Sequence, residues 1–283
     1  GAVGAYNAQA ALLGNRITKL RGETFEGRVL KKLDLKPAPI STQIAPPEPL
    51  AQYLFACVCL CATFGQFGRD CRHLMRSEIG ELSEEFAKGQ VGSSTMAHKR
   101  NPISFENLEG MWIKTKNEFG KVLDTLISEH QRDLVGSSVS RDFPIIPVNL
   151  AQQLSTLLRR KGEGKTFLER VTFDTDSLSR NFDKSASKMM AEPMYLALQM
   201  AGYDGDAHEL VNHKALQLVR DDATLIDAIE LLSKSDKKLS RAFQNIPNET
   251  KEILKNPKLY TGNARKKTSQ VVKDARKYLN NAS

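Results

Sequence analysis

The residues from Pro49 to Gly68, PLAQYLFACVCLCATFGQFG, decide the fold class. Apolar side chains recur along this stretch in steps of four and three residues, the spacing of one face of an α-helix. They are Leu50, Leu54, Cys57, Cys61 and Phe64. The stretch carries no charge for 20 residues, about the length of a bilayer crossing, but its continuous apolar part is only about half as long. We therefore predict a buried core helix rather than a transmembrane helix.

Helical patterns also fill most of the chain around this stretch. Three long helices are expected, from about residue 50 to 86, from 103 to 130 and from 148 to 160. Shorter amphipathic patterns follow at 175–187, 191–201, 206–219, 223–233, 236–244 and 265–280, and no strand pattern is convincing. Two glycines among charges at 161–165 mark a boundary. The prediction is an all-α fold with a long-helix domain over 1–164, which includes a loop at 89–102, and a smaller helical domain over 165–283.

Composition excludes several classes of protein. Hydrophobic residues make up 40% and charged residues 26% of the chain, which excludes a disordered tail, a collagen-like fibre and a disulfide-stapled miniprotein. The net charge is +8, and residues 251–283, with nine basic and two acidic side chains, account for +7 of it. A basic tail fits either nucleic acid or a solvated helix face. Only Tyr260 and Tyr278 could stack on bases there, so we favour the solvated face and expect no nucleic-acid partner.

All four cysteines lie between residues 57 and 71. On a helix Cys57 and Cys61 share a face, whereas Cys59 points about 160° away from them. A single metal ion therefore cannot collect all three thiols, and no histidine stands at ligand spacing. We expect small core residues in a reducing compartment, and no metal site.

The segment from Gly92 to Pro102, GSSTMAHKRNP, interrupts the helical pattern. Gly92 frees the backbone to form an anion-binding nest, Ser93 and Ser94 add donors, and two basic residues add positive charge. The same composition also suits a loop that only caps the next helix. Composition alone leaves these two interpretations about even.

The order of residues in this segment resembles the signature loop of the fumarase/aspartase superfamily of lyases, G-S-S-x-M-P-x-K-x-N-P. Ten of its eleven residues obey that pattern. The exception is Ala97, which stands where the family has proline. Proline stiffens a loop without adding side-chain chemistry, so the exchange bears on the rigidity of the loop.

Other segments resemble the same superfamily. Residues 1–7 look like its central helix, 41–44 (STQI) like its substrate loop, and 106–110 (ENLEG) like the segment after the signature. Residues 131–133 (QRD) and 137–141 (SSVSR) are similar to the adenylosuccinate lyase branch in particular. In that branch these two segments hold the phosphate and ribose end of the nucleotide.

The resemblance implies a reaction and a set of site residues. The reaction is elimination of fumarate from adenylosuccinate, giving AMP, and from the succinyl-aminoimidazole-carboxamide ribotide of purine biosynthesis, without a cofactor. Ser93 is the implied base, while Ser94, Lys99 and Asn101 stabilise the dianion that forms. Gln43 holds the succinyl end and Asn107 supports the site. Phosphate binding falls to Arg132, Ser137 and Arg141. The resemblance further implies a cytoplasmic homotetramer whose active sites are shared between subunits.

Three alternatives stay open from the sequence. Another branch, a carboxymuconate cycloisomerase or an argininosuccinate lyase, acts on substrates without a nucleotide phosphate. A catalytically silent helical scaffold could use the basic tail on nucleic acid. The arginines 132 and 141 could merely pair on the surface with Asp133 and Asp142. The superfamily also has a preceding domain with a histidine-bearing loop, and none of the five histidines here stands in that context. We therefore expect this chain to be the C-terminal portion of a longer enzyme, and incomplete as a catalyst by itself.

Overall fold

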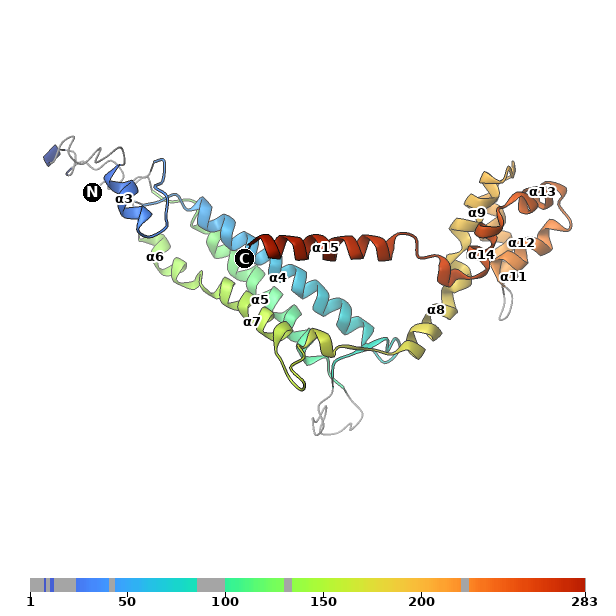
Figure 1. Ribbon diagram of the computed structural model, residues 1–283, viewed down its shortest axis with the longest axis horizontal. Coiled ribbons are helices and arrows are strands. Elements are labelled where there is room, and N and C mark those ends of the chain that lie inside the picture. Colours follow the sequence, from blue (N-terminus) through green and yellow to red (C-terminus); the bar gives the residue numbers. More distant parts are fainter. Residues whose placement is uncertain are drawn as a thin grey trace. The chain divides into compact units, whose positions relative to one another are not determined.

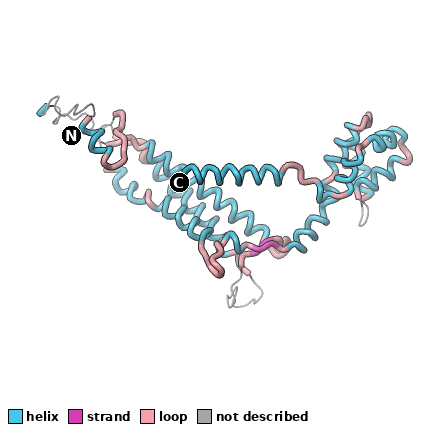
Figure 2. The backbone as a smooth tube through the Cα atoms, in the orientation of Figure 1, coloured by secondary structure: helices cyan, strands magenta, loops and turns pink. Residues whose placement is uncertain are grey.

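The chain folds into two helical units. The computed structural model describes residues 8, 11–12, 24–40, 44–85, 100–129, 134–219 and 224–282. The first compact unit is Gly1–Asp174 and the second is Thr175–Ser283. Helices dominate both units (Figures 1 and 2). The all-α prediction is therefore confirmed, apart from one pair of very short strands among the described residues.

Three long helices form the body of the first unit, and α5 and α7 both pack against α4. The helices of this unit are α3 (Phe25–Lys31), α4 (Glu48–Leu74), α5 (Ile103–Asp124), α6 (Val135–Val139) and α7 (Ile145–Leu158), with 3-10 turns η1 (Ser140–Asp142) and η2 (Leu168–Arg170). Its two strands, β1 (Leu82–Ser83) and β2 (Thr172–Phe173), form an antiparallel pair.

The backbones of α4 and α5 approach each other closely at two glycines. A Cβ atom on Gly65 would lie 2.6 Å from Cβ of Trp112, and one on Gly68 would lie 2.6 Å from the carbonyl oxygen of Phe105. These pairs run in opposite sequence directions, so the two helices are antiparallel. Only glycine fits these two positions without moving the helices apart.

The core of the first unit consists of two apolar clusters separated by a polar layer. One cluster gathers around Leu54, Val122 and Ile146 and the other around Phe105 and Leu108. The polar layer between them comprises Cys61, Thr115, Asn149 and Gln153, all of them fully buried. The amide of Gln153 donates to the carbonyl oxygens of Cys61 (3.2 Å) and Leu108 (2.8 Å), which links α7 to both neighbours.

Helix α4 is long and apolar enough to cross a membrane by length and composition alone. One of its faces is buried in the two clusters, as predicted for a core helix. Large apolar side chains of the same helix stay exposed, namely Leu50, Tyr53, Phe55 and Leu60, each between 41% and 57% exposed. The helix therefore serves as a core element and also leaves several large apolar side chains accessible.

Several predicted boundaries were wrong. The first long helix ends at Leu74 instead of continuing to about residue 86, because a turn follows in which Gly80 has a φ of 62°. The two strands were not predicted, since two-residue strands carry no alternating pattern. The short helices α3, α6 and α14 (Asn248–Lys255) were also missed. The predicted domain boundary after residue 164 lies in the connection between α7 and β2.

The second unit packs short helices around one apolar cluster that includes Met194, Leu198 and Ile229. Its other helices are α8 (Thr175–Met189), α9 (Ala191–Met200), α10 (Ala207–Glu209), α11 (Leu216–Leu218), α12 (Leu225–Ser233), α13 (Lys237–Asn245) and α15 (Ala264–Ala282), with a π-helical turn η3 (Leu210–Ala215) and a 3-10 turn η4 (Pro257–Leu259). Thr224 and Asp227 form a capping box at the start of α12. The described side chains of α15 are all exposed, as expected for a solvated basic tail.

Candidate active site

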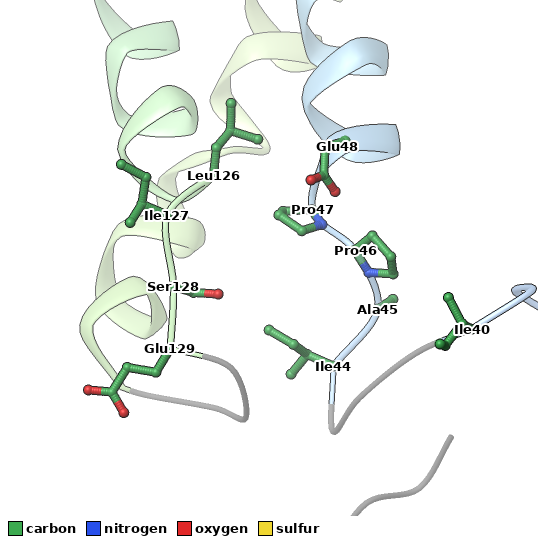
Figure 3. A pocket seen from close by; sticks show the side chains of 10 residues that line it. All are labelled: Ile40, Ile44, Ala45, Pro46, Pro47, Glu48, Leu126, Ile127, Ser128 and Glu129. Carbon is green, nitrogen blue, oxygen red and sulfur yellow. The ribbon is translucent and has the colours of Figure 1, made fainter. Parts of the chain in front are cut away.

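A cavity of about 560 Å³ opens at the end of the first unit where α4 begins and α5 ends. Figure 3 shows its two walls, the segment that leads into α4 and the segment that follows α5. The lining residues are Ile40, Ile44, Ala45, Pro46, Pro47, Glu48, Leu126, Ile127, Ser128 and Glu129. Pro46 and Pro47 fix the φ angle at their positions in the first wall, and neither has a backbone N–H to donate.

Both walls continue directly into segments that the sequence assigns to substrate binding. Ile40 and Ile44 flank residues 41–43, and Glu129 precedes residues 130–133. Gln43 and Arg132 themselves lie outside the described residues. The cavity nevertheless places the two stretches of chain that adjoin them face to face, although these stretches are more than 80 residues apart in the sequence.

The described lining of the cavity is mostly apolar. Its charged side chains are two carboxylates, Glu48 and Glu129, and no basic residue contributes among the described lining residues. Apolar walls suit the flat faces of a base, and carboxylates accept hydrogen bonds from hydroxyl and amino groups. A phosphate would need cations supplied by neighbouring segments.

Ser137 and Arg141 lie close to the same end of α5. Ser137 is half-buried on α6, whose Gly136 lies next to Thr125, and Arg141 is exposed on η1. Asp142 pairs with Lys121 at 2.7 Å, and together with Glu118 it raises the pKa of the Lys121 ammonium. Among the residues that the structure describes, Arg141 forms no ion pair. Arg141 and Asp142 thus do not pair with each other, whereas Arg132 and Asp133 lie outside the described residues.

The described end of the signature segment, residues 100–102, lies at the opposite end of α5. Ser93, Ser94 and Lys99 fall outside the described residues, whereas Asn101 is half-buried and its carbonyl accepts from the N–H of Ile103 at 2.9 Å. Asn107 is exposed on the second turn of α5. The described portion of the signature segment therefore leads directly into this helix.

Among the described site residues, Asn101 lies far from Ser137 and Arg141 within one chain. Asn101 precedes α5, whereas the cavity, Ser137 and Arg141 follow it. The helix has 22 residues, and at a rise of about 1.5 Å per residue it separates the two groups by about 33 Å.

Sequence reasoning missed two carboxylates that join segments of this unit. Glu109 is nearly buried on α5 and pairs with Arg69 (2.7 Å) and Arg72 (2.9 Å) on α4. Glu84 follows β1 and accepts from the backbone N–H of Phe105 at the start of α5. Neither contact has a local signal, because each depends on residues 20 or more positions away.

The four cysteines are unpaired. Burial, followed by the charges of Asp70 and Glu84, raises the pKa of the Cys71 thiol to about 11. Over the described ranges, no group of three histidine, cysteine or acidic side chains is arranged to hold a metal ion.

Comparison with known proteins identifies the relatives of this chain. The family model described as Lyase matches residues 6–115. The adenylosuccinate lyase of Archaeoglobus fulgidus is 32% identical over 253 residues, which is 89% of this chain and 54% of that protein. The adenylosuccinate lyase of Pyrococcus horikoshii is 33% identical over 88% of this chain and 52% of its own length. This chain thus spans about half the length of the curated relatives it matches.

Solved structures support the same fold. The 3-carboxy-cis,cis-muconate lactonizing enzyme of Pseudomonas putida aligns with a TM-score of 0.66 at 20% identity, over 89% of this chain and 52% of that one. A fumarate lyase of Mesorhizobium aligns with a TM-score of 0.62 at 20% identity, over 86% and 51%. At this identity the likeness concerns the fold alone. Sequence and fold thus point the same way: part of this chain matches the family model described as Lyase, and adenylosuccinate lyases are similar to it over about half of their own length.

Proposed function

We propose that this chain forms part of an adenylosuccinate lyase, which eliminates fumarate from adenylosuccinate to give AMP and from the succinyl-aminoimidazole-carboxamide ribotide of purine biosynthesis. The observation that carries the proposal is the identity of about 32% to adenylosuccinate lyases over nine-tenths of the chain. The muconate enzyme resembles this chain in fold only, so the cycloisomerase alternative lacks comparable support. The cytoplasm is the proposed compartment, which agrees with four free cysteines.

The proposed chemistry is a β-elimination. A base removes the proton on the carbon beside a carboxylate, the charge spreads into that carboxylate as an aci-dianion, and an acid protonates the leaving amine. Ser93 is the proposed base. Ser94, Lys99 and Asn101 would donate to the dianion, and one such preorganised donor is worth about 3–4 kcal/mol of transition-state stabilisation.

The proposed substrate contacts divide between the two ends of α5. Gln43 would hold the succinyl end and Asn107 would support the site from α5. Arg132, Ser137 and Arg141 would bind the phosphate, and the absence of a described ion pair on Arg141 leaves its guanidinium available for this role. The apolar cavity beside them suits the nucleoside portion of the substrate.

We further propose a homotetramer with active sites shared between subunits. Ser93 is seven residues from Arg100, so even a fully extended chain carries it at most about 25 Å from there. That reach is shorter than the length of about 33 Å that α5 places between the signature segment and the cavity. The exposed apolar side chains of α4 are groups that association would cover.

The test is a comparison of phosphorylated and dephosphorylated substrate in the full-length protein. Arg141→Met keeps much of the side-chain bulk and removes the charge, and we expect it to raise KM for adenylosuccinate about ten- to a hundredfold. Binding of the dephosphorylated analogue should barely change. Arg76→Met, at another arginine that is 58% exposed, is the control and should affect neither substrate. Equal losses on both substrates would assign Arg141 to the fold instead of the phosphate.

The base is tested separately. Ser93→Ala should remove most of kcat and leave KM nearly unchanged, because the hydroxyl acts on a proton only in the transition state. Ser94→Ala removes only a donor and should cost less. A larger loss in the Ser94 variant would show that the base has been assigned to the wrong serine.

A further inference from the structure

The start of α5 lacks a cap from its own segment. The residue before the helix is Pro102, whose side chain makes no capping hydrogen bond. The first N–H groups of any helix need acceptors from outside it. Here Ser104 and Phe105 are 8% and 0% exposed, so water has little access to these two residues. An acceptor must therefore come from another part of the chain.

Glu84 supplies that acceptor from 21 positions earlier in the sequence. Its carboxylate accepts from the N–H of Phe105 at 2.9 Å and also hydrogen-bonds to Ser104. Arg159, at the end of α7, approaches Ser104 at 3.5 Å and adds a positive charge beside the carboxylate. The start of α5 is thus held by side chains from the β1 segment and from α7.

The segment that carries Glu84 is itself fixed. Ser83 and Thr172 join their hydroxyls at 2.8 Å within the β1–β2 pair, and the next residue, Glu85, pairs with Arg170 at 2.6 Å. Burial raises the pKa of the Glu84 carboxyl despite the favourable contacts with Phe105, Ser104 and Arg159. Holding a carboxylate in this place is therefore costly, which indicates a use beyond filling space.

We propose that Glu84 is a positioning residue for the elimination reaction: by binding the first turn of α5 it fixes the location of Asn101. Asn101 stands two residues before the helix and is joined to Ile103 through its carbonyl. Its side chain is a donor in the proposed mechanism, so a shift of this turn would move a group that acts on the developing dianion. This inference rests on the proposed function, in which Asn101 contacts the substrate.

The test uses the full-length protein with three variants. Glu84→Ala removes the acceptor, whereas Glu84→Gln keeps an oxygen that can accept from Phe105. Glu78→Gln changes a carboxylate that is 72% exposed and lies outside this contact. Two quantities are measured for each, the hydrogen-exchange rate of the Phe105 amide and the values of kcat and KM for adenylosuccinate well below the unfolding midpoint.

We expect Glu84→Ala to exchange the Phe105 amide at least tenfold faster and to lower kcat at least tenfold, with KM within about threefold. Glu84→Gln should largely restore both quantities, and Glu78→Gln should match the wild type. If the alanine variant does not fold, Glu84→Asp withdraws the carboxylate by one methylene. We expect this variant to show faster exchange and a lower kcat with little change in KM, each effect smaller than for alanine.

Two results would overturn the proposal. An unchanged exchange rate would mean that Glu84 does not hold this amide. Faster exchange with an unchanged kcat would mean that the contact serves stability alone. Failure of the wild type to release fumarate from adenylosuccinate would instead remove the proposed function, while the exchange measurement would still report whether Glu84 holds the helix.

Discussion

The close approach of α4 and α5 at Gly68 makes a quantitative prediction for Gly68→Ala. The added Cβ would lie 2.6 Å from the carbonyl oxygen of Phe105 and 2.9 Å from Cβ of Leu108, whereas ordinary contact begins at 3.4 Å. The backbone carbonyl cannot rotate aside as a flexible side chain could. The helices would therefore have to separate by about 0.8 Å, the difference between these two distances.

Two opposing effects set the size of the change in stability. Overpacking a well-packed core costs about 1–3 kcal/mol, and a rigid backbone partner places this contact in the upper part of that range. Replacing glycine by alanine inside a helix stabilises the folded state by about 1 kcal/mol, because alanine has the higher helix propensity. The expected net result for Gly68→Ala is a loss of about 1–2 kcal/mol in the free energy of unfolding.

A matched control separates the two effects. Gly120 lies in α5 with nothing within 4 Å of an added Cβ, so Gly120→Ala gains the propensity without the clash. It should stabilise the protein by about 1 kcal/mol. Urea unfolding of both variants, followed by circular dichroism, gives a difference of about 2–3 kcal/mol if the packing cost is real. Equal stabilisation by the two substitutions would refute the close contact between the helices.

Two further predictions concern buried groups of the first unit. Alkylation of Cys71 by iodoacetamide should be far slower than that of exposed Cys59 below pH 9, since the Cys71 pKa of about 11 keeps it a thiol. The same raised pKa of Cys71 favours the folded state below pH 9, and that contribution to stability should disappear as the pH rises through 11. Mass spectrometry measures the alkylation rates, and unfolding at several pH values measures the stability. Similar alkylation rates for the two cysteines would contradict the prediction. Asn149→Leu should stabilise the protein by about 1–2 kcal/mol in urea unfolding, because neither polar atom of this buried side chain has a partner among the described residues. Gln153→Leu, which removes two hydrogen bonds, should have the opposite sign, and destabilisation by both would show that Asn149 is satisfied after all.

The long helices could be predicted because their apolar faces repeat over many turns. Leu54, Cys57 and Cys61 stand at helical spacing, and all three are buried as that spacing requires. The end of α4 could not be predicted, because the charged residues after Gly68 continue to fit a helix. The turn there is fixed by β1, which depends on a strand 90 positions away.

Part of the candidate site could likewise be predicted from the sequence, and part could not. Asn101, Ser137 and Arg141 could be named because they stand in ordered motifs, although the structure places them at opposite ends of a helix. The cavity could not be predicted, since Ile44 and Ile127 look like ordinary apolar residues until the fold opposes them. The residues next to Glu84 in the sequence do not indicate its role either. Its importance depends on the uncapped turn at Ser104 and Phe105, which only the tertiary structure reveals.

Because β1 pairs with β2, the first unit cannot finish folding during synthesis until β2 has been made. The α4–α5 hairpin is available once residue 124 has left the ribosome. Leu157 and Phe167, which belong to the same cluster as Phe105, and the strand β2, which pairs with β1, are made later. At about 5–20 residues per second, the roughly 50 residues up to β2 take several seconds. Throughout that interval Phe105 and Leu108 lack part of their cover, so the nascent hairpin exposes apolar surface that favours aggregation and chaperone binding.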